Sequence, residues 1–365
     1  MRILIDGGCW SNARGYGRFT RELLGALARA PRHEYTVLME EQAGEDYDLP
    51  LPAVFVKPSR PAGEAATSSG RRSIRDLLLM SRAAASAAPA GLFFPSVYSY
   101  FPIVRPVKAL LGVHDTMADR FPQFAFDSAT QQRFWQWKMR LALWQCRDVL
   151  TVSDYSKKSI AEYWKTSAKH IHVIPEGPAG LFRPKNIPRR DVVLSVGGIS
   201  PNKNLATLIL AFSKVRAGVE LWIAGDYQSD GFKTCYRELA DLAANLPVRF
   251  LGRVTDEELC RLYNEARLLA FPSVEEGFGL PAVEAMACGL PVVAHDGHAV
   301  AEVVGDAGVL IDARDEHALA SAINRVLDDP TLAEQLRARG LERASRYSWQ
   351  HAADALQDIF DSIWA

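Results

Sequence analysis

Short, almost wholly apolar runs recur along the 365-residue chain and are separated by polar or amphipathic segments. Runs of this length without polar alternation are typical of parallel strands that are buried on both faces. We predict seven such strands in the first half of the chain, over 3–6, 35–39, 53–57, 92–94, 109–113, 149–152 and 171–174. Six more are predicted in the second half, over 192–196, 221–224, 248–251, 268–271, 292–294 and 309–311.

Helical periodicity fills the intervals between these strands, for example over 18–29, 205–215, 256–266 and 317–327. Strands that alternate with helices predict parallel sheets covered by helices on both faces. Because two such series follow one another, we predict an α/β fold of two doubly wound, Rossmann-like domains.

Proline, glycine and charged residues gather without periodicity over 176–190, which is the composition of a domain boundary. We therefore expect one domain over 1–180 and a second over 181–365. We leave open that the last helix packs on the first domain.

No apolar run has the length of a membrane-spanning helix. The nearest one, the uncharged stretch between Arg82 and Arg105, is interrupted by prolines and a glycine, so we expect a strand with loops there. The five cysteines are scattered, without the spacing of a zinc site or a disulfide framework. These features predict a soluble, cytoplasmic protein.

Residues 1–190 contain 27 Lys and Arg against 17 Asp and Glu, whereas residues 191–365 contain 15 against 26. An excess of cations in the first half suggests peripheral contact with something anionic, such as the inner face of the cytoplasmic membrane. Attraction between the two domains is an equal alternative.

Two segments of the first half combine cations with apolar residues. Residues 131–147 mix aromatic and cationic side chains at helical spacing, and a membrane-contacting helix is one interpretation. We favour a core helix, whose buried residues would be Phe134, Trp137, Leu141 and Trp144. The stronger candidates for contact with an anionic membrane or a pyrophosphate lipid are Arg71, Arg72, Arg75 and Arg82.

The segment 271–293, FPSVEEGFGLPAVEAMACGLPVV, predicts a strand, a glycine-containing loop and a helix. Pro281 suits the first turn of that helix, and Gly289 suits its C-terminal cap. The glycines allow a ligand to approach the backbone, and the helix N-terminus offers N–H groups to a phosphate. Glu276 and Glu284 frame the loop, and carboxylates accept hydrogen bonds from sugar hydroxyl groups. A purely structural unit is the alternative.

This segment resembles the signature of the retaining glycosyltransferase family 4, through Glu276 and Glu284 within EGFGLPAVEAMACGLPVV. The resemblance covers nearly the whole C-terminal half and continues more weakly through the N-terminal half. It implies the GT-B fold, in which two Rossmann-like domains face each other across a cleft. In that family the second glutamate binds the ribose, the first approaches the donor sugar, and loop amides contact the sugar and the diphosphate. The loop residues are Gly277, Phe278, Gly279 and Leu280.

A glycine turn follows the eighth predicted strand and carries Lys203 just before a helix. Helix N-termini repel cations, so a ligand role for Lys203 is favoured over that of a surface lysine. The family has a pair of cations around this turn that binds the donor diphosphate. Here Gly198 and Asn202 stand where an arginine is common, and Arg253 is the candidate substitute.

Two features of the first half also resemble the family. Gly15 and Gly17 precede a helix, as do the family's first-loop glycines that pack against the donor diphosphate, and they do not form the NAD fingerprint. His114 and Asp115 follow a strand at the sheet edge where ligands bind, and the family often has His-Asp there, facing the donor sugar and the acceptor. A structural His–Asp contact is the alternative.

The resemblance implies transfer of a hexose, with retention at the anomeric carbon, from a nucleotide-sugar donor to a glycan or lipid-linked saccharide. It implies catalytic roles for His114, Lys203 and Glu276. Residues 14–24 together with His114 and Asp115 are most similar to bacterial mannosyltransferases of polysaccharide and O-antigen assembly. This similarity favours GDP-mannose, with UDP- and dTDP-sugars as alternatives.

We expect no metal, no cofactor and no nucleic-acid partner. Asp46-Tyr47-Asp48 matches the D-x-D metal motif by chance, because it lies in an acidic loop near the N-terminus. Two functions of other classes stay open: a nucleotide-sugar epimerase that needs no acceptor, and a catalytically silent nucleotide-sugar-binding protein, suggested by the missing arginine.

Overall fold

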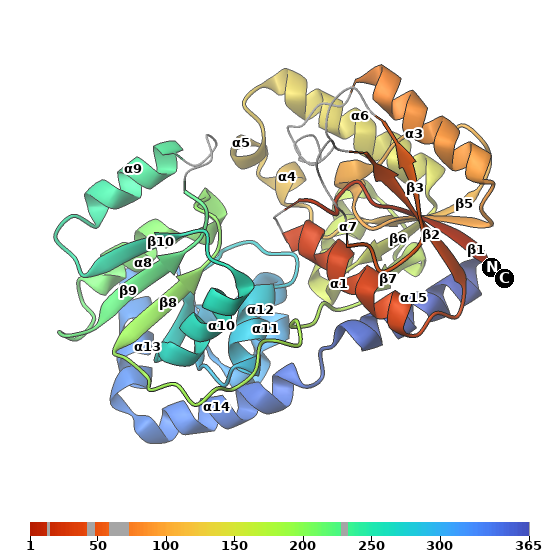
Figure 1. Ribbon diagram of the computed structural model, residues 1–365. Coiled ribbons are helices and arrows are strands. Elements are labelled where there is room, and N and C mark those ends of the chain that lie inside the picture. Colours follow the sequence, from red (N-terminus) through yellow and green to blue (C-terminus); the bar gives the residue numbers. More distant parts are fainter. Residues whose placement is uncertain (13–14, 42–47, 58–72, 228–232, 365) are drawn as a thin grey trace. The chain divides into compact units, whose positions relative to one another are not determined.

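The computed structural model describes residues 1–12, 15–41, 48–57, 73–227 and 233–364 (Figure 1). The chain divides into two compact units, Met1–Glu176 with Trp349–Ala365, and Gly177–Ser348. Each unit contains one sheet of parallel strands, and every predicted apolar run forms a strand of one of them. The predicted α/β class with two doubly wound sheets is confirmed.

The seven-stranded sheet of the first unit has the order β3-β2-β1-β4-β5-β6-β7. All pairings between its described strands are parallel, and Leu4 of β1 lies between Thr36 of β2 and Leu92 of β4. The strand order turns back at β1 and β4, which is the topological switch point of a doubly wound fold. The strands are β1 (Arg2–Asp6), β2 (Glu34–Glu40), β3 (Ala53–Val56), β4 (Gly91–Phe94), β5 (Lys108–Gly112), β6 (Asp148–Thr151) and β7 (Ile171–Val173).

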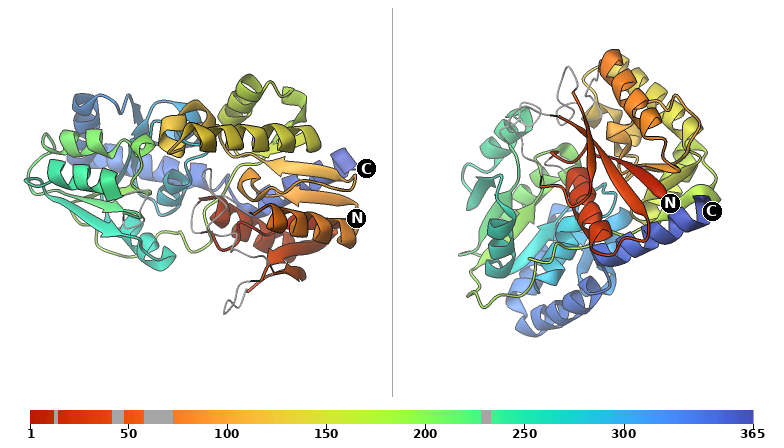
Figure 2. Two further views of the ribbon diagram at one scale, coloured as in Figure 1. Left: turned by 90° about the horizontal axis from the view of Figure 1, so that it is seen from above. Right: turned by 45° about the vertical axis from the view of Figure 1, so that its right-hand side comes forward.

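Helices cover both faces of this sheet (Figure 2). Side chains of α3, α6 and α7 share one core with Leu92 and Phe94 of β4. The opposite face is covered by α1 and α15, where Phe360 packs edge-to-face on Phe93. The helices are α1 (Gly15–Arg29), α3 (Ile74–Ala87), α4 (Met117–Arg120), α5 (Pro122–Ala125), α6 (Ala129–Gln145), α7 (Asp154–Trp164) and α15 (Trp349–Trp364), with the 3₁₀ turns Val97–Ser99 and Ala168–His170.

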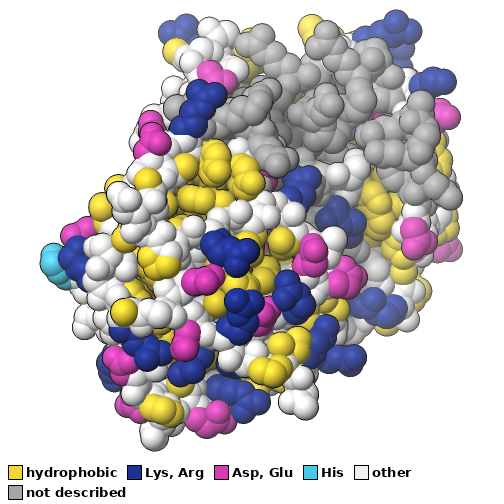
Figure 3. Space-filling view, turned by 60° about the vertical axis from the view of Figure 1, so that its left-hand side comes forward, with side chains coloured by type: hydrophobic (Ala, Val, Ile, Leu, Met, Phe, Trp, Pro, Cys, Tyr) yellow, Lys and Arg dark blue, Asp and Glu magenta, His cyan; other side chains and the backbone are white. Residues whose placement is uncertain are grey.

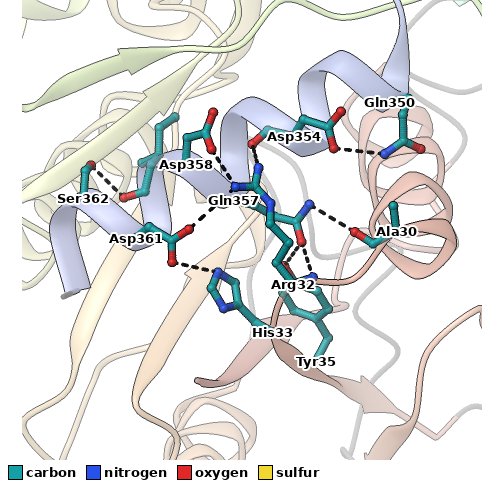
Figure 4. Close-up of polar contacts among 11 residues, drawn as sticks. Ala30, Arg32, His33, Tyr35, Gln350, Asp354, Gln357, Asp358, Asp361 and Ser362 are labelled. Carbon is teal, nitrogen blue, oxygen red and sulfur yellow. Dashed lines mark hydrogen bonds and ion pairs between the residues drawn. The ribbon is translucent and has the colours of Figure 1, made fainter.

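Helix α15 returns to the first unit, the alternative that the sequence left open, so the second unit ends at Ser348. Figure 4 shows the polar contacts that hold this helix. The fully buried Gln357 accepts hydrogen bonds from the Arg32 amide (2.6 Å) and the Tyr35 hydroxyl (2.9 Å). It also donates to the carbonyl oxygen of Ala30 at 3.2 Å, so its buried amide group is well satisfied.

The six-stranded sheet of the second unit has the order β10-β9-β8-β11-β12-β13, and its described pairings are all parallel. This is the same winding as in the first unit. The strands are β8 (Val192–Val196), β9 (Glu220–Ala224), β10 (Val248–Gly252), β11 (Leu268–Phe271), β12 (Val292–His295) and β13 (Val309–Ile311). The helices are α8 (Leu205–Phe212), α9 (Lys233–Leu242), α10 (Asp256–Glu265), α11 (Leu280–Ala287), α12 (His298–Val304), α13 (Glu316–Asp328) and α14 (Pro330–Ala344), with the 3₁₀ turns Pro201–Lys203 and Gly305–Ala307.

The expected boundary segment 176–190 is fastened to helix α10 of the second unit. The Lys185 amide donates to Asn264 Oδ1 at 2.7 Å, and Asn264 Nδ2 donates to the Arg183 carbonyl at 3.1 Å. Arg190 Nη1 lies 3.0 Å from Glu265 Oε1. Residues 177–190 therefore belong to the second unit, which begins at 177 and not at the expected 181.

The predicted core face of α6 is wrong. Phe134, Trp137, Leu141 and Trp144 are 65%, 71%, 37% and 79% exposed. The helix instead buries Trp135, Met139 and Ala142, which follow one another at intervals of four and three and so also satisfy helical spacing. Because apolar residues occur on two sides of this helix, periodicity alone did not identify the buried one.

Two other expectations are corrected. Residues 83–87, expected in a strand with loops, form the last turns of α3.

The charge excess of the first half shrinks when residues are assigned to units: the first unit has 23 Lys and Arg against 20 Asp and Glu. Figure 3, which brings forward the side of Figure 1 where the second unit is drawn, shows cationic and anionic side chains next to one another. Within the described ranges, every helix is too short or too polar to span a bilayer.

Candidate functional site

The loop between β11 and α11 has the geometry that its sequence predicts. Gly279 is the N-cap of α11 with φ +105°, a backbone conformation that disfavours other residues. Leu280 is the first helical residue and Pro281 follows it in the first turn. The helix ends in a Schellman motif, in which Gly289 (φ +66°) donates to Met286 and the next residue donates to Ala285.

Lys203 and Glu276 come together in the second unit, although 73 positions separate them. Lys203 Nζ donates a hydrogen bond to Glu276 Oε1, and it also lies 5.5 Å above the ring centre of Phe271. Their side chains are only 17% and 16% exposed, so water screens this ion pair weakly. The pair lies beyond the carboxyl ends of β8 and β11, the edge where open α/β sheets bind ligands.

Asn202 holds the lysine-bearing turn against the loop after β11. Its side-chain Nδ2 donates to the Glu275 carbonyl at 3.1 Å, and its own carbonyl accepts from the Val274 amide at 2.9 Å. Ser200 Oγ donates to Asn202 Oδ1 at 2.6 Å. The residue that stands where the family has a cation thus joins the two loops that carry Lys203 and Glu276.

The glycines of this turn allow close approach of neighbouring backbone. A Cβ atom at Gly225, after β9, would overlap the Gly197 carbonyl oxygen. Gly197 itself has φ +146°, and a Cβ atom there would come within 3.1 Å of the Lys203 side chain. Gly198 follows and is half-buried. Tight contact between these turns brings the ends of β8 and β9 together.

Arg253 follows β10 at the same edge of the sheet. Its Nη2 lies 3.7 Å from Asp226 Oδ2, and its side chain is 65% exposed. The Asp226 carbonyl accepts a hydrogen bond of 3.2 Å from the Ile199 amide, beside the glycine turn. The cation therefore stands close to the turn and is paired with Asp226.

Glu284 lies inside the second unit, one turn into α11, and is 1% exposed. Its Oε2 accepts a hydrogen bond of 3.1 Å from the Tyr263 hydroxyl of α10. Of the loop residues before it, Gly277 is half-buried, and Phe278 is buried with its ring edge-to-face on Tyr347 at 5.6 Å. The loop is thus anchored at its centre by an aromatic contact.

Glu275 and His298 are absent from the residues expected at the site. Glu275 is 2% exposed, and its carboxylate lies 3.4 Å from His298 Nδ1. His298 has φ +59°, a strained conformation for a residue with a side chain. Nothing in the sequence marks this strain, because histidine is an ordinary first residue of a helix.

In the first unit, His114 follows β5 and is held in one orientation. Its Nε2 lies 2.9 Å from the Pro95 carbonyl oxygen, so Nε2 carries the proton and donates it. The ring packs edge-to-face on Phe19 of α1, and Nδ1 lies 3.8 Å from the Glu176 carboxylate. Burial lowers the pKa of His114 to about 4, which keeps the ring neutral at pH 7.

We expect His114 to destabilise the protein as the pH falls. Its folded pKa lies below the ordinary 6.5, so its contribution to the free energy of unfolding is complete above pH 6.5 and is lost as the pH falls toward 4. The loss amounts to about 3 kcal/mol. The free energy of unfolding, measured with denaturant at pH 7 and at pH 4.5, should therefore fall more between these pH values in the wild type than in His114→Gln. Equal losses in both proteins would contradict the lowered pKa.

Asp115 and Asp119 organise the short helix α4 after His114. Asp115 Oδ1 accepts a hydrogen bond of 2.8 Å from the Met117 amide, which supports the first turn of that helix. The buried Asp119 accepts from the indole N–H groups of Trp135 (2.6 Å) and Trp164 (3.1 Å). Burial raises the pKa of Asp119 to about 6, and the two indole hydrogen bonds oppose this rise.

Gly15 and Gly17 begin α1 in different surroundings. A Cβ atom at Gly17 would overlap the Asn12 carbonyl oxygen, so packing alone demands glycine there. A Cβ atom at Gly15 would meet no atom of the described residues within 4 Å, and Gly15 is exposed. Packing therefore explains Gly17 and leaves Gly15 unexplained.

The described residues contain no group of three histidine, cysteine or carboxylate side chains arranged to hold a metal ion. Asp46 and Tyr47 of the chance D-x-D motif lie outside the described ranges, as do Arg14, Arg71 and Arg72.

Family models match both halves of the chain. The model described as "Glycosyl transferases group 1" matches residues 181–343, and "Glycosyltransferase Family 4" matches residues 13–177. O-antigen chain mannosyltransferase B of Escherichia coli is 30% identical over 260 residues, which cover 67% of this chain and 68% of that protein. MMP alpha-(1->4)-mannosyltransferase of Mycolicibacterium hassiacum is 33% identical over 229 residues, which cover 60% of this chain and 55% of that protein.

Solved structures share the fold at lower identity. Sucrose-phosphate synthase from Thermosynechococcus elongatus superposes with a TM-score of 0.81 at 22% identity, covering 100% of this chain and 99% of that one. HepE from Anabaena, in complex with UDP-glucose, superposes with a TM-score of 0.76 at 19% identity, covering 99% and 100%. With its two doubly wound units and the loop that carries Glu276 and Glu284, the chain belongs to glycosyltransferase family 4 of the GT-B fold.

Proposed function

We propose that this glycosyltransferase moves mannose from GDP-mannose to a glycan or a lipid-linked saccharide, with retention at the anomeric carbon. The observation that carries the proposal is the partly buried pair of Lys203 and Glu276 beside the N-terminus of α11. A cation, a carboxylate and helix amides in one place suit a sugar joined to a diphosphate.

The donor would divide its contacts between these groups. Lys203 would leave Glu276 for the diphosphate and neutralise the charge that grows on it as the glycosidic bond breaks. The amides at the start of α11 would bind the same phosphates, and Glu276 would accept hydrogen bonds from the sugar hydroxyl groups. Glu284 would bind the ribose. Arg253 would supply a second cation by exchanging Asp226 for the diphosphate.

A retaining transfer needs a group that takes the proton of the acceptor hydroxyl. His114 is neutral at pH 7, but its Nε2 proton is directed at the Pro95 carbonyl oxygen and its unprotonated Nδ1 lies 3.8 Å from the Glu176 carboxylate. We therefore assign His114 and Asp115 to positioning the donor sugar and the acceptor. The leaving phosphate oxygen would then take the proton of the acceptor hydroxyl. The acceptor would attack the anomeric carbon on the face from which the phosphate departs, so the configuration would be retained.

The choice of donor rests on the relatives. The two relatives described above are named as mannosyltransferases, which supports mannose. A solved structure of the same fold contains UDP-glucose, so UDP-sugars are the second candidates. Because a lipid-linked acceptor is presented at a membrane, we also propose that the enzyme works at the inner face of the cytoplasmic membrane.

Donor screening tests the proposal. Thermal shift with GDP-mannose, UDP-glucose, a dTDP-sugar and an ADP-sugar should give the largest rise in Tm with GDP-mannose. Transfer to a polyprenyl-linked saccharide should then occur with GDP-mannose and persist in EDTA, since Lys203 and helix amides supply the positive charge. A larger shift with another donor would overturn the donor. Rearrangement of the donor without acceptor would indicate an epimerase. Binding without turnover would indicate a catalytically silent protein. Loss of activity in EDTA that Mn²⁺ restores would indicate a metal-dependent enzyme.

Glu284→Ala should weaken binding of the nucleoside diphosphate, because a buried ribose hydroxyl pair loses its acceptor, at a cost of about 1–3 kcal/mol. Calorimetry with GDP measures the change. Tyr263→Phe is the matched control, since it removes only the hydroxyl that Glu284 accepts from and should affect GDP less. Unchanged affinity in a folded Glu284→Ala would remove Glu284 from the donor site.

A further inference from the structure

One face of helix α6 exposes large apolar side chains to solvent. Trp137 and Trp144 are 71% and 79% exposed, and Phe134 and Leu141 lie on the same side of the helix at 65% and 37%. These four residues follow one another at intervals of three and four, so they form a continuous stripe along the helix. A contiguous apolar stripe of this length marks an interaction surface rather than ordinary surface variation.

Cations border this stripe. Arg133 and Arg140 are exposed and lie seven residues apart on α6, so they form a row beside the apolar side chains. Arg147, also exposed, follows the end of the helix at Gln145. No aspartate or glutamate occurs between residues 129 and 147. We call the α6 face the set Arg133, Phe134, Trp137, Arg140, Leu141, Trp144 and Arg147.

The surface continues onto neighbouring segments of the same unit. Residues 100–106 lie between α3 and α6: Ser81 Oγ of α3 donates to the Pro102 carbonyl at 2.6 Å, and Gln145 Nε2 of α6 donates to the Ile103 carbonyl at 2.9 Å. Figures 1 and 2 show α3 and α6 on the same side of the sheet. The exposed apolar and cationic residues here are Ile74, Arg75, Leu78, Arg82, Val104 and Arg105. Across these segments of the described chain, the one carboxylate, Asp76, is buried.

We propose that the α6 face docks on an anionic lipid bilayer, with α3 and residues 100–106 beside it. Tryptophan and arginine together suit the boundary between headgroups and acyl chains, because the indole ring tolerates both and the arginine stem reaches back to water or phosphate. Anionic headgroups would neutralise the arginine row. A second copy of this chain fits poorly, since two such faces would bring arginines together without a carboxylate between them.

The buried side of α6 connects this face to the loops of the first unit. Trp135 stacks on Tyr98 at 5.3 Å, and Tyr98 contacts Tyr16, which lies between Gly15 and Gly17, at 4.7 Å. The Trp135 indole also donates to Asp119, four residues after Asp115. A bilayer on the outer side would therefore lie one helix away from these loops. That this brings a lipid-linked acceptor within reach rests on the proposed function.

Vesicle sedimentation tests the docking surface. Purified protein should co-sediment with vesicles of phosphatidylglycerol mixed with phosphatidylcholine, and less with phosphatidylcholine alone or at high salt. The double variant Trp137→Ser/Trp144→Ser should lower partitioning into the anionic vesicles by about tenfold or more. Arg133→Gln/Arg140→Gln should lower it by about thirtyfold and weaken its salt dependence, while the other arginines of the surface keep the remainder. Both pairs are exposed, so thermal melting should show unchanged folding.

Leu210→Ser/Leu242→Ser is the matched control, because it removes two exposed apolar side chains of the second unit, at 41% and 36%. This variant should bind vesicles like the wild type. Absence of binding by the wild type, or full binding by the tryptophan variant, would overturn the proposal. Size-exclusion chromatography adds a further outcome: a dimer that the tryptophan variant dissolves would identify a second copy as the occupant, again overturning it.

Transfer to a short, water-soluble acceptor separates this proposal from the enzymatic one. The tryptophan variant should retain wild-type rates there, because Trp137 and Trp144 are exposed side chains and are not among the residues assigned to the donor or the acceptor. If neither protein transfers sugar but the wild type still binds vesicles, the proposed function fails and the docking surface stands. If the wild type transfers sugar normally but does not bind vesicles, the docking surface fails and the proposed function stands.

Discussion

Lys203→Gln should lower the turnover number by about a hundredfold or more, the range seen when a charge-stabilising group is removed from an active site. The charge that Lys203 would neutralise grows as the donor's glycosidic bond breaks, so its loss should affect kcat more than donor affinity. The structure sharpens this expectation, because Lys203 is only 17% exposed and already pairs with the carboxylate of Glu276. Lys203→Arg keeps the charge in a different shape and should retain partial activity.

Steady-state kinetics and calorimetry with GDP measure the two effects separately. Lys214→Gln is the matched control: Lys214 Nζ lies 2.8 Å from Glu316 Oε1 in a more exposed pair, so the same chemical change is made away from the site. Its kinetics should equal those of the wild type. Near-wild-type turnover in Lys203→Gln would make Lys203 a structural partner of Glu276, and Arg253 would become the leading candidate for the cation.

Gly17→Ala should lower the stability of the first unit, whereas Gly15→Ala should lower activity alone. The methyl group at position 17 would overlap the Asn12 carbonyl, and displacing that backbone costs about 1–3 kcal/mol or more. We expect a fall in Tm of roughly 5–10 °C. The described residues leave open space for a methyl group at Gly15, so the Tm should stay unchanged.

Activity should fall through a loss of donor contacts in Gly15→Ala, the variant whose Tm stays unchanged. If Gly15 allows the donor diphosphate to approach the backbone, a methyl group there should lower kcat/KM by about tenfold or more, since it removes contacts made by the bound donor. Calorimetry with GDP locates the loss at donor binding. Wild-type kinetics in Gly15→Ala would show that Gly15 is a helix-start residue without a ligand.

The strands were predictable because both sheets are parallel and buried. A strand such as 192–196, Val-Val-Leu-Ser-Val, is apolar at nearly every position, and few other structures require that pattern. The loop of Glu276 was predictable for a similar reason: Gly279, Pro281 and Gly289 each occupy a position that the backbone geometry restricts.

The direction that a helix faces was less predictable. Helix α6 carries apolar residues around most of its circumference, so two sets of positions satisfy a core-facing stripe. The buried set contains a tryptophan, Trp135, as the exposed set contains Trp137 and Trp144, so side-chain size does not distinguish the two faces. Such a choice depends on the shape of the neighbouring elements, which no local pattern contains.

Contacts across long sequence distances were also not visible. Arg253 pairs with Asp226, which follows a different strand. Asn202 likewise joins its own loop to the loop after another strand through a hydrogen bond. The sequence places all of these residues at one sheet edge, but it does not say which pairs form. The left-handed backbone conformation of His298 is likewise not visible in its residue type.

The membership of α15 in the first unit has a consequence for synthesis on the ribosome. Because Gly177–Ser348 is contiguous, the second unit can complete its fold as soon as those residues have emerged. The first unit must wait: until residues 349–364 are made, the aromatic surface around Phe93 and the polar groups of Arg32 and Tyr35 lack their partners. The half of the protein that is translated first is therefore the half that finishes folding last.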